Sequence, residues 1–120
     1  MAYLIELKKH QDQRGSLVVV EDMQLPFKIK RVYSIMNPSG VRGGHRHKKT
    51  VQAMICLVGS CVVYNNDGVE EREFVLDDAR KCLILEAKDW HQMKNFSDDC
   101  VLQVFASHYY DAADYIDEAY

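Results

Sequence analysis

The sequence predicts an all-β protein, because short runs rich in β-branched and apolar residues alternate with turn-forming residues along most of the chain. Its 120 residues are enough for one domain, spanning 1–120. The candidate strands cover residues 17–20, 29–35, 51–58, 61–64, 72–76, 81–86 and 101–107. About seven or eight strands in a chain of this length are typical of a sandwich or a barrel.

The segments between these runs have the chemistry of tight turns. They read NPSG at 37–40, NNDG at 65–68 and FSDD at 96–99, and Gly, Asn and Asp tolerate positive φ or bond their own backbone. The tail at 109–120, YYDAADYIDEAY, is the one stretch that predicts a short C-terminal helix.

The composition limits the classes of binding partner and the cellular compartment that we expect. The formal net charge is -3, so no overall basic field attracts nucleic acid. No segment approaches the roughly 18 apolar residues of a membrane span, and the N-terminus does not read as a signal peptide, so we expect a cytoplasmic protein. The four cysteines form no CxxC pair and lie mostly in apolar runs, which predicts reduced core residues; they are Cys56, Cys61, Cys82 and Cys100.

Alternation along the run at 29–35 sets polar side chains beside apolar ones. Arg31 and Tyr33 share a strand face with Ile29 and Ile35. Two interpretations fit this pattern: a solvent-facing arginine with a tyrosine at the rim, or polar groups placed inside a barrel pocket.

His45 and His47 are one residue apart, so their imidazoles share a face if the segment is extended. Gly43 and Gly44 precede them and permit a sharp bend or close backbone approach. One interpretation of this spacing is a pair of histidines exposed on the surface. Two converging free imidazoles would instead supply general acid–base groups near neutral pH.

The spacing around this pair resembles the two motifs of the cupin superfamily, a double-sheet β-barrel, or jelly roll. His-x-His is followed by Gln52 and then Gly59, and later His91 is followed after three residues by Asn95. The second motif departs from the pattern at two positions, where Glu86 and Lys88 replace the usual Pro and Gly.

Gln52 stands where metal-binding cupins have a glutamate. A site with two histidines and one carboxylate suits nonhaem iron because the carboxylate adds charge and an oxygen ligand, and a neutral amide is a poor substitute. We therefore expect no metal and no cofactor. Three histidines still suit zinc, so a metal-dependent cupin remains an alternative.

A closer resemblance covers nearly the whole chain. The segments that carry it are DQRGSLVVVED, PFKIKRVYSI, RGGHRHKKTVQ, CLVGSCVVYNNDG, KDWHQMKNFSDDCVL and ASHYYDAADYI, and together they resemble the nucleotide-sugar 3,4-ketoisomerases. The resemblance implies a metal-independent enzyme that converts dTDP-4-keto-6-deoxyglucose to its 3-keto isomer for 3-amino-3,6-dideoxyhexose biosynthesis. It also implies a homodimer with exchanged N-terminal strands.

The same resemblance suggests roles for individual residues. His47 is assigned to C–H proton transfer and His45 to the oxygen-side shuttle, an order that the sequence leaves open, while Tyr33 donates a hydrogen bond to the enolate oxygen. Arginines are suited to the diphosphate because the guanidinium fork pairs two oxygens at once. The expected substrate-binding residues are Arg14, Arg31, Arg42, Arg46, Gln52, Trp90 and His91.

Two other functions remain in view. One is a dTDP-sugar 3,5-epimerase, a cupin family that pairs a histidine base with a tyrosine acid in longer chains. The other is a noncatalytic or metal-dependent small-molecule cupin. The C4 configuration of the product and the downstream sugar stay open.

Overall fold

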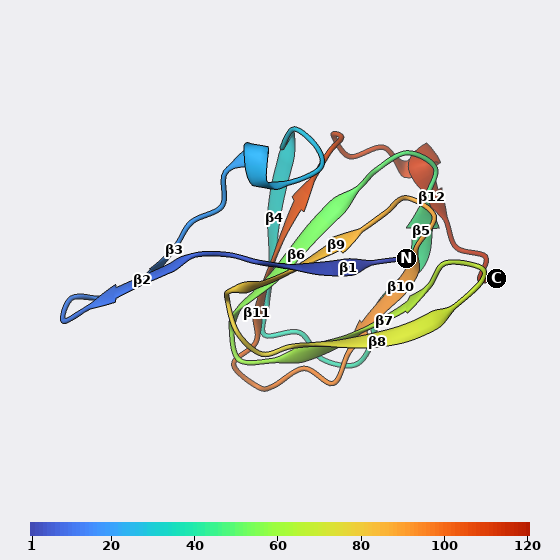
Figure 1. Cartoon of the computed structure of the whole chain (residues 1–120). Helices are drawn as coiled ribbons and strands as arrows, with labels where there is room; N and C mark the ends of the chain where they lie inside the picture. Colours follow the sequence, from blue (N-terminus) through green and yellow to red (C-terminus); the bar gives the residue numbers. More distant parts are fainter.

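The computed structural model describes all residues, 1–120, as two facing five-stranded antiparallel sheets and a projecting hairpin (Figure 1). The first sheet has the order β1 (Tyr3–Glu6), β9 (Lys81–Leu85), β6 (Gln52–Val58), β11 (Val101–Ala106), β4 (Arg31–Met36). The second has the order β12 (Tyr115–Ile116), β5 (Arg42–His47), β10 (Trp90–Lys94), β7 (Cys61–Asn66), β8 (Glu71–Leu76). The predicted all-β, double-sheet barrel is confirmed.

The core lies between the sheets, and the first sheet is also covered on its outer face. Met54 and Leu83 belong to the main cluster, whereas Ile55 and Ile84, next to them on β6 and β9, belong to a second cluster. Because both faces of these two strands are buried, their sequences are continuous apolar runs rather than alternating ones. The four cysteines are free and buried, as predicted.

The predicted C-terminal helix is wrong. Residues Ala112–Asp114 form one 3-10 turn (η2), capped by the Asp111 side chain, which accepts a hydrogen bond from the Ala113 amide. The chain then becomes extended, and Tyr115–Ile116 pairs with β5. The two residues after the turn, an aromatic and a β-branched one, favour an edge strand over further helix. The strands β1, β2, β5, β10 and β12 were not among those expected.

The hairpin of β2 (Lys9–Asp12) and β3 (Gly15–Val18) extends away from the barrel (Figure 1). Its side chains are exposed except at Val18. A 3-10 turn, η1 (Asp22–Gln24), follows before the chain enters β4. Among the helical segments, none has the length and apolar character needed to cross a membrane.

Candidate active site

A β-bulge in β5 affects the orientation of the histidines on this strand. His91 of β10 pairs with His45, but the next residue, Gln92, pairs with Gly43, so β5 carries an extra residue at this point. Gly43 and Gly44 both have positive φ, +83° and +80°, a region that glycine enters without cost. A Cβ on Gly43 would lie 3.0 Å from the His91 carbonyl oxygen. Glycine is therefore needed where the strands approach closely.

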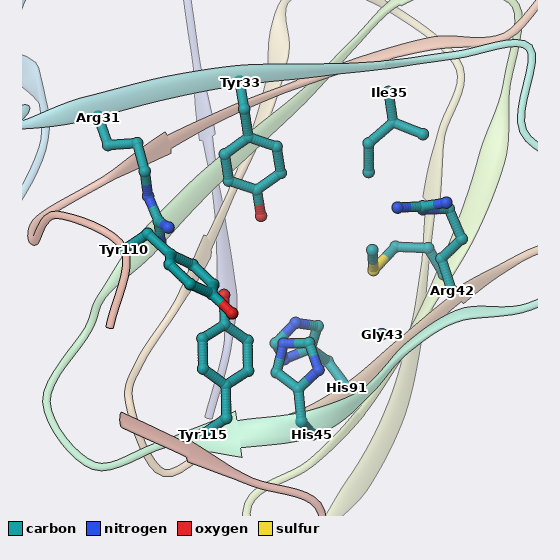
Figure 2. A pocket seen from close by; sticks show the side chains of 10 residues that line it. Arg31, Tyr33, Ile35, Arg42, Gly43, His45, His91, Tyr110 and Tyr115 are labelled. Atoms are coloured by element: carbon teal, nitrogen blue, oxygen red, sulfur yellow. The ribbon is translucent and has the colours of Figure 1, made fainter. Parts of the chain in front are cut away.

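A cavity of about 310 Å³ opens between β4 and β5 (Figure 2). Strand β4 contributes Arg31, Tyr33 and Ile35 from one side, so of the two interpretations left open by the sequence the structure favours polar groups placed inside a barrel pocket. The remaining lining residues are Arg42, Gly43, His45, His91, Met93, Tyr110 and Tyr115.

Three imidazoles meet beside this cavity. The ring centroid of His45 lies 5.1 Å from that of His47 and 5.0 Å from that of His91, so the prediction that His45 and His47 share a face is confirmed. His45 and His91 line the cavity, whereas His47 lies behind them and is only 3% exposed. Burial lowers the pKa of His45 and of His47, and it lowers the pKa of His91 to about 3. All three are therefore neutral at pH 7.

Asp114 fixes the orientation and tautomer of His47. Its carboxylate lies 2.9 Å from His47 Nδ1 and also accepts hydrogen bonds from the Thr50 hydroxyl and the Lys49 amide. Burial would raise the pKa of Asp114, but these hydrogen bonds outweigh it and lower the pKa to about 2. An ionised carboxylate only accepts, so His47 carries its proton on Nδ1 and presents the lone pair of Nε2.

The Nε2 atom of His47 is buried and has no hydrogen-bond partner within the chain. It is therefore free to accept a proton. In His91 the tautomer is fixed in the same way, because Nδ1 lies 3.0 Å from the Asp89 carbonyl oxygen, which can only accept. Asp114 was not among the residues selected from the sequence.

Gln52 acts on the cavity through Tyr33. Its amide nitrogen donates a 3.0 Å hydrogen bond to the Tyr33 hydroxyl oxygen, which leaves the hydroxyl hydrogen of Tyr33 to donate toward the cavity (Figure 2). Burial, followed by the nearby Tyr115, raises the pKa of Tyr33, so it remains a neutral donor at pH 7. Gln52 itself is buried behind Tyr33 and does not line the cavity.

The four selected arginines separate into two groups. Arg31 and Arg42 line the cavity, and the Arg31 guanidinium lies 5.5 Å from the centroid of the Tyr33 ring. Arg46 points to the opposite face of β5, where its guanidinium lies over the Tyr120 ring. Arg14 is at the tip of the exposed hairpin and pairs with Asp12.

Trp90 is also turned away from the cavity. It alternates with His91 on β10, packs edge-on against Tyr64, and donates from its indole nitrogen to the Asp117 carbonyl oxygen. Within one copy of the chain, Arg14, Arg46 and Trp90 are therefore not brought together with the histidines.

The three imidazoles also have the geometry of a metal-ligand set. Their candidate ligand nitrogens lie within 4.8 Å of one another, and the Nδ1 atoms of His47 and His91 are held by acceptors, as in many metal-binding histidines. No carboxylate joins the three, because the motif position is Gln52 and its amide nitrogen is engaged with Tyr33. The residues present suit zinc better than nonhaem iron.

Known proteins resemble this chain over nearly its whole length. The family model described as FdtA (WxcM-like, C-terminal) matches residues 2–120. A curated relative from Aneurinibacillus thermoaerophilus, a TDP-4-oxo-6-deoxy-alpha-D-glucose-3,4-oxoisomerase, is 47% identical over 116 residues, which cover 94% of this chain and 84% of the relative.

Two solved structures superpose with a TM-score of 0.93 and 38% identity over 98% of this chain. One is a histidine-to-asparagine mutant of the 3,4-ketoisomerase QdtA from Thermoanaerobacterium thermosaccharolyticum in complex with TDP-4-keto-6-deoxyglucose, of which 87% is covered. The other is the TDP-quinovose 3,4-ketoisomerase WlaRB from Campylobacter jejuni, of which 92% is covered.

Sugar epimerases share the fold at lower similarity. A 3'-monoepimerase from Streptomyces bikiniensis has a TM-score of 0.85 at 19% identity, which shows a common barrel alone. The family model matches residues 2–120, and the oxoisomerase is 47% identical, which is a much higher sequence identity than that of the epimerase. The chain belongs to the FdtA family of WxcM-like, C-terminal cupin domains.

Proposed function

We propose that this protein is a 3,4-ketoisomerase that converts TDP-4-keto-6-deoxyglucose to its 3-keto isomer. The observation that carries the proposal is the Asp114-backed His47, whose ring packs behind His45, next to a cavity of about 310 Å³ that His45 and Tyr33 line. Proton transfer between adjacent carbons needs a base, an acid and a donor to the intermediate oxygen, and these residues supply all three. The product would serve an aminotransferase that makes 3-amino-3,6-dideoxyhexoses.

The reaction begins with loss of the C3 proton. His47 Nε2 accepts this proton, the C–H electrons form the C3–C4 double bond, and the C4 carbonyl oxygen becomes an enolate oxygen. Tyr33 donates a hydrogen bond to that oxygen, which develops negative charge. The proton then returns to C4, and His45 transfers the O3 hydroxyl proton to O4. The product has a carbonyl at C3 and a hydroxyl at C4.

Asp114 makes this proton transfer possible in a buried position. An isolated imidazolium at His47 would be costly because its ring is withdrawn from water. The Asp114 carboxylate at 2.9 Å stabilises the charge as it forms. His47 is thus the base, and His45, which lines the cavity itself, is the group that moves protons between the two oxygens.

Binding of the TDP moiety is assigned to the arginines at the cavity. Arg31 and Arg42 approach it from β4 and β5 (Figure 2), and each guanidinium fork suits a pair of phosphate oxygens. His91, which stays neutral, is placed to accept a hydrogen bond from a sugar hydroxyl through Nε2. A cytoplasmic location fits the four free thiols.

A homodimer with exchanged N-terminal hairpins is the proposed assembly. The β2–β3 hairpin extends away from the barrel, and the Leu17 side chain on it is 56% exposed. The two strands pair only with each other, and such free strand edges favour pairing with another copy of the chain. Sedimentation of the purified protein at micromolar concentration should give a dimer, and removal of residues 9–18 should give a monomer. A monomeric intact chain would contradict this assembly.

Chelation should leave the activity intact. The proposed proton transfers use only side chains, and no carboxylate completes the three-histidine set, so exhaustive treatment with a chelator followed by gel filtration is expected to leave kcat unchanged. Metal content by elemental analysis is the control. Activity lost on chelation and restored by zinc or iron would favour a metal-dependent cupin instead.

The function itself is tested by incubating the protein with TDP-4-keto-6-deoxyglucose and following the sugar protons by NMR. A 3-keto product is expected. Inversion at C3 and C5 without movement of the carbonyl would identify an epimerase, and no turnover would identify a binding protein.

A further inference from the structure

Tyr115 lies against both catalytic histidines, and no proton transfer has been assigned to it. It is directly opposite His47 in the antiparallel pair of β12 and β5, and residues opposite each other in such a pair project from the same face. Its ring centroid is 4.7 Å from that of His45 and 4.7 Å from that of His47. Tyr115 therefore forms the wall of the site next to both imidazoles.

The hydroxyl of Tyr115 is available to a bound molecule. Its side chain lines the cavity, and its hydroxyl group makes no hydrogen bond with any other group of the chain. Tyr33, by contrast, has its oxygen occupied by the Gln52 amide. The two tyrosines enter from opposite sheets, Tyr33 from β4 and Tyr115 from β12 (Figure 2). Burial, followed by the electrostatic effect of Tyr115, raises the pKa of Tyr33, which fits a Tyr115 side chain that faces the same cavity.

The chemistry of keto–hydroxy exchange calls for two donors. Each of the two sugar oxygens is the carbonyl oxygen on one side of the reaction and the hydroxyl oxygen on the other. Negative charge therefore develops on O4 when the C3 proton leaves, and on O3 when the reaction runs in reverse. A single donor stabilises one of these oxygens, whereas a pair of donors on opposite walls stabilises both.

We propose that Tyr115 is a further catalytic residue, which donates a hydrogen bond to the second reacting oxygen while Tyr33 donates to the first. This proposal rests on the proposed ketoisomerase function. Tyr33 and Tyr115 then bracket the O3–C3–C4–O4 unit, and the two histidines lie along one side of it.

The test removes the Tyr115 hydroxyl and keeps the ring. Tyr115→Phe is expected to lower kcat by about 10²-fold, the usual size of the loss of one donor to a developing oxyanion, with KM changed by less than about 3-fold. Tyr109→Phe is the matched control, because Tyr109 is 72% exposed and does not line the cavity; its kcat should equal that of the unmodified protein.

Two further measurements separate a donor from a packing residue. Tyr115→Phe should leave the melting temperature and the ring-proton NMR signals of the histidines unchanged, since the ring stays in place, whereas Tyr115→Leu should shift those signals. Tyr115→Phe with kcat within 2-fold of the unmodified protein would overturn the proposal, as would a loss of kcat that appears only together with shifted histidine signals. If the unmodified protein forms no 3-keto product, the ketoisomerase function fails, and the role of Tyr115 fails with it.

Discussion

Replacing His47 by asparagine is expected to lower kcat by about 10²–10⁴-fold, equivalent to roughly 3–5 kcal/mol of activation free energy. Asparagine keeps much of the side-chain volume and a donor toward Asp114, but it has no nitrogen that accepts the C3 proton. Turnover of TDP-4-keto-6-deoxyglucose measured by proton NMR gives the rate. Binding of TDP, measured by calorimetry, should persist because Arg31 and Arg42 are untouched.

His10→Asn is the matched control for this change. His10 is exposed on the β2 strand and lies outside the cavity, so its replacement should not affect kcat in a protein of unchanged assembly. Near-normal turnover by His47→Asn together with a sharply lower melting temperature would mean that the histidine pair is structural, and that residues 42–52 form a barrel corner instead of an active site.

Replacing Asp114 by asparagine is expected to lower kcat by a similar factor, about 10²–10⁴-fold. The amide nitrogen of asparagine would donate to His47 Nδ1 and so favour the tautomer with its proton on Nε2, which cannot accept the C3 proton. The carboxylate that stabilises the imidazolium would also be lost. Proton and nitrogen NMR of the His47 ring would report the tautomer directly.

Asp98→Asn serves as the control for Asp114→Asn, because Asp98 is an exposed aspartate that does not line the cavity. The Asp114 variant should bind TDP as the unmodified protein does and should melt at a lower temperature, since Thr50 and the Lys49 amide lose part of their acceptor. Unchanged kcat with a His47 ring still protonated on Nδ1 would contradict the role of Asp114.

Alternation within strands accounts for most of what could be predicted about the cavity. Arg31 and Tyr33 share a face of β4, and His45 and His47 share a face of β5, because side chains on a strand repeat every second residue. The same rule argues against Arg46, which lies between the two histidines and therefore points outward. Trp90 points outward for the same reason, since its neighbour His91 points inward.

Asp114 and Tyr115 could not be recognised in this way. Asp114 lies 67 residues from His47 along the chain, in a tail whose composition suggested a helix, and only the pairing of β12 with β5 brings the two together. Long-range strand pairing leaves little local signal in a single sequence. The order of the two histidines was open for the same reason, since Asp114 is what distinguishes them.

The most direct test of the proposed mechanism is conversion of TDP-4-keto-6-deoxyglucose in D₂O, with the position of the label determined by NMR. If proton transfer passes through an imidazole that exchanges with solvent, the 3-keto product should carry deuterium at C4, and the His47→Asn variant should lose both turnover and label. A 3-keto product with no solvent deuterium at C4 would contradict an exchanging imidazole. Deuterium at C3 and C5 of a sugar that keeps its 4-keto group would contradict the ketoisomerase itself.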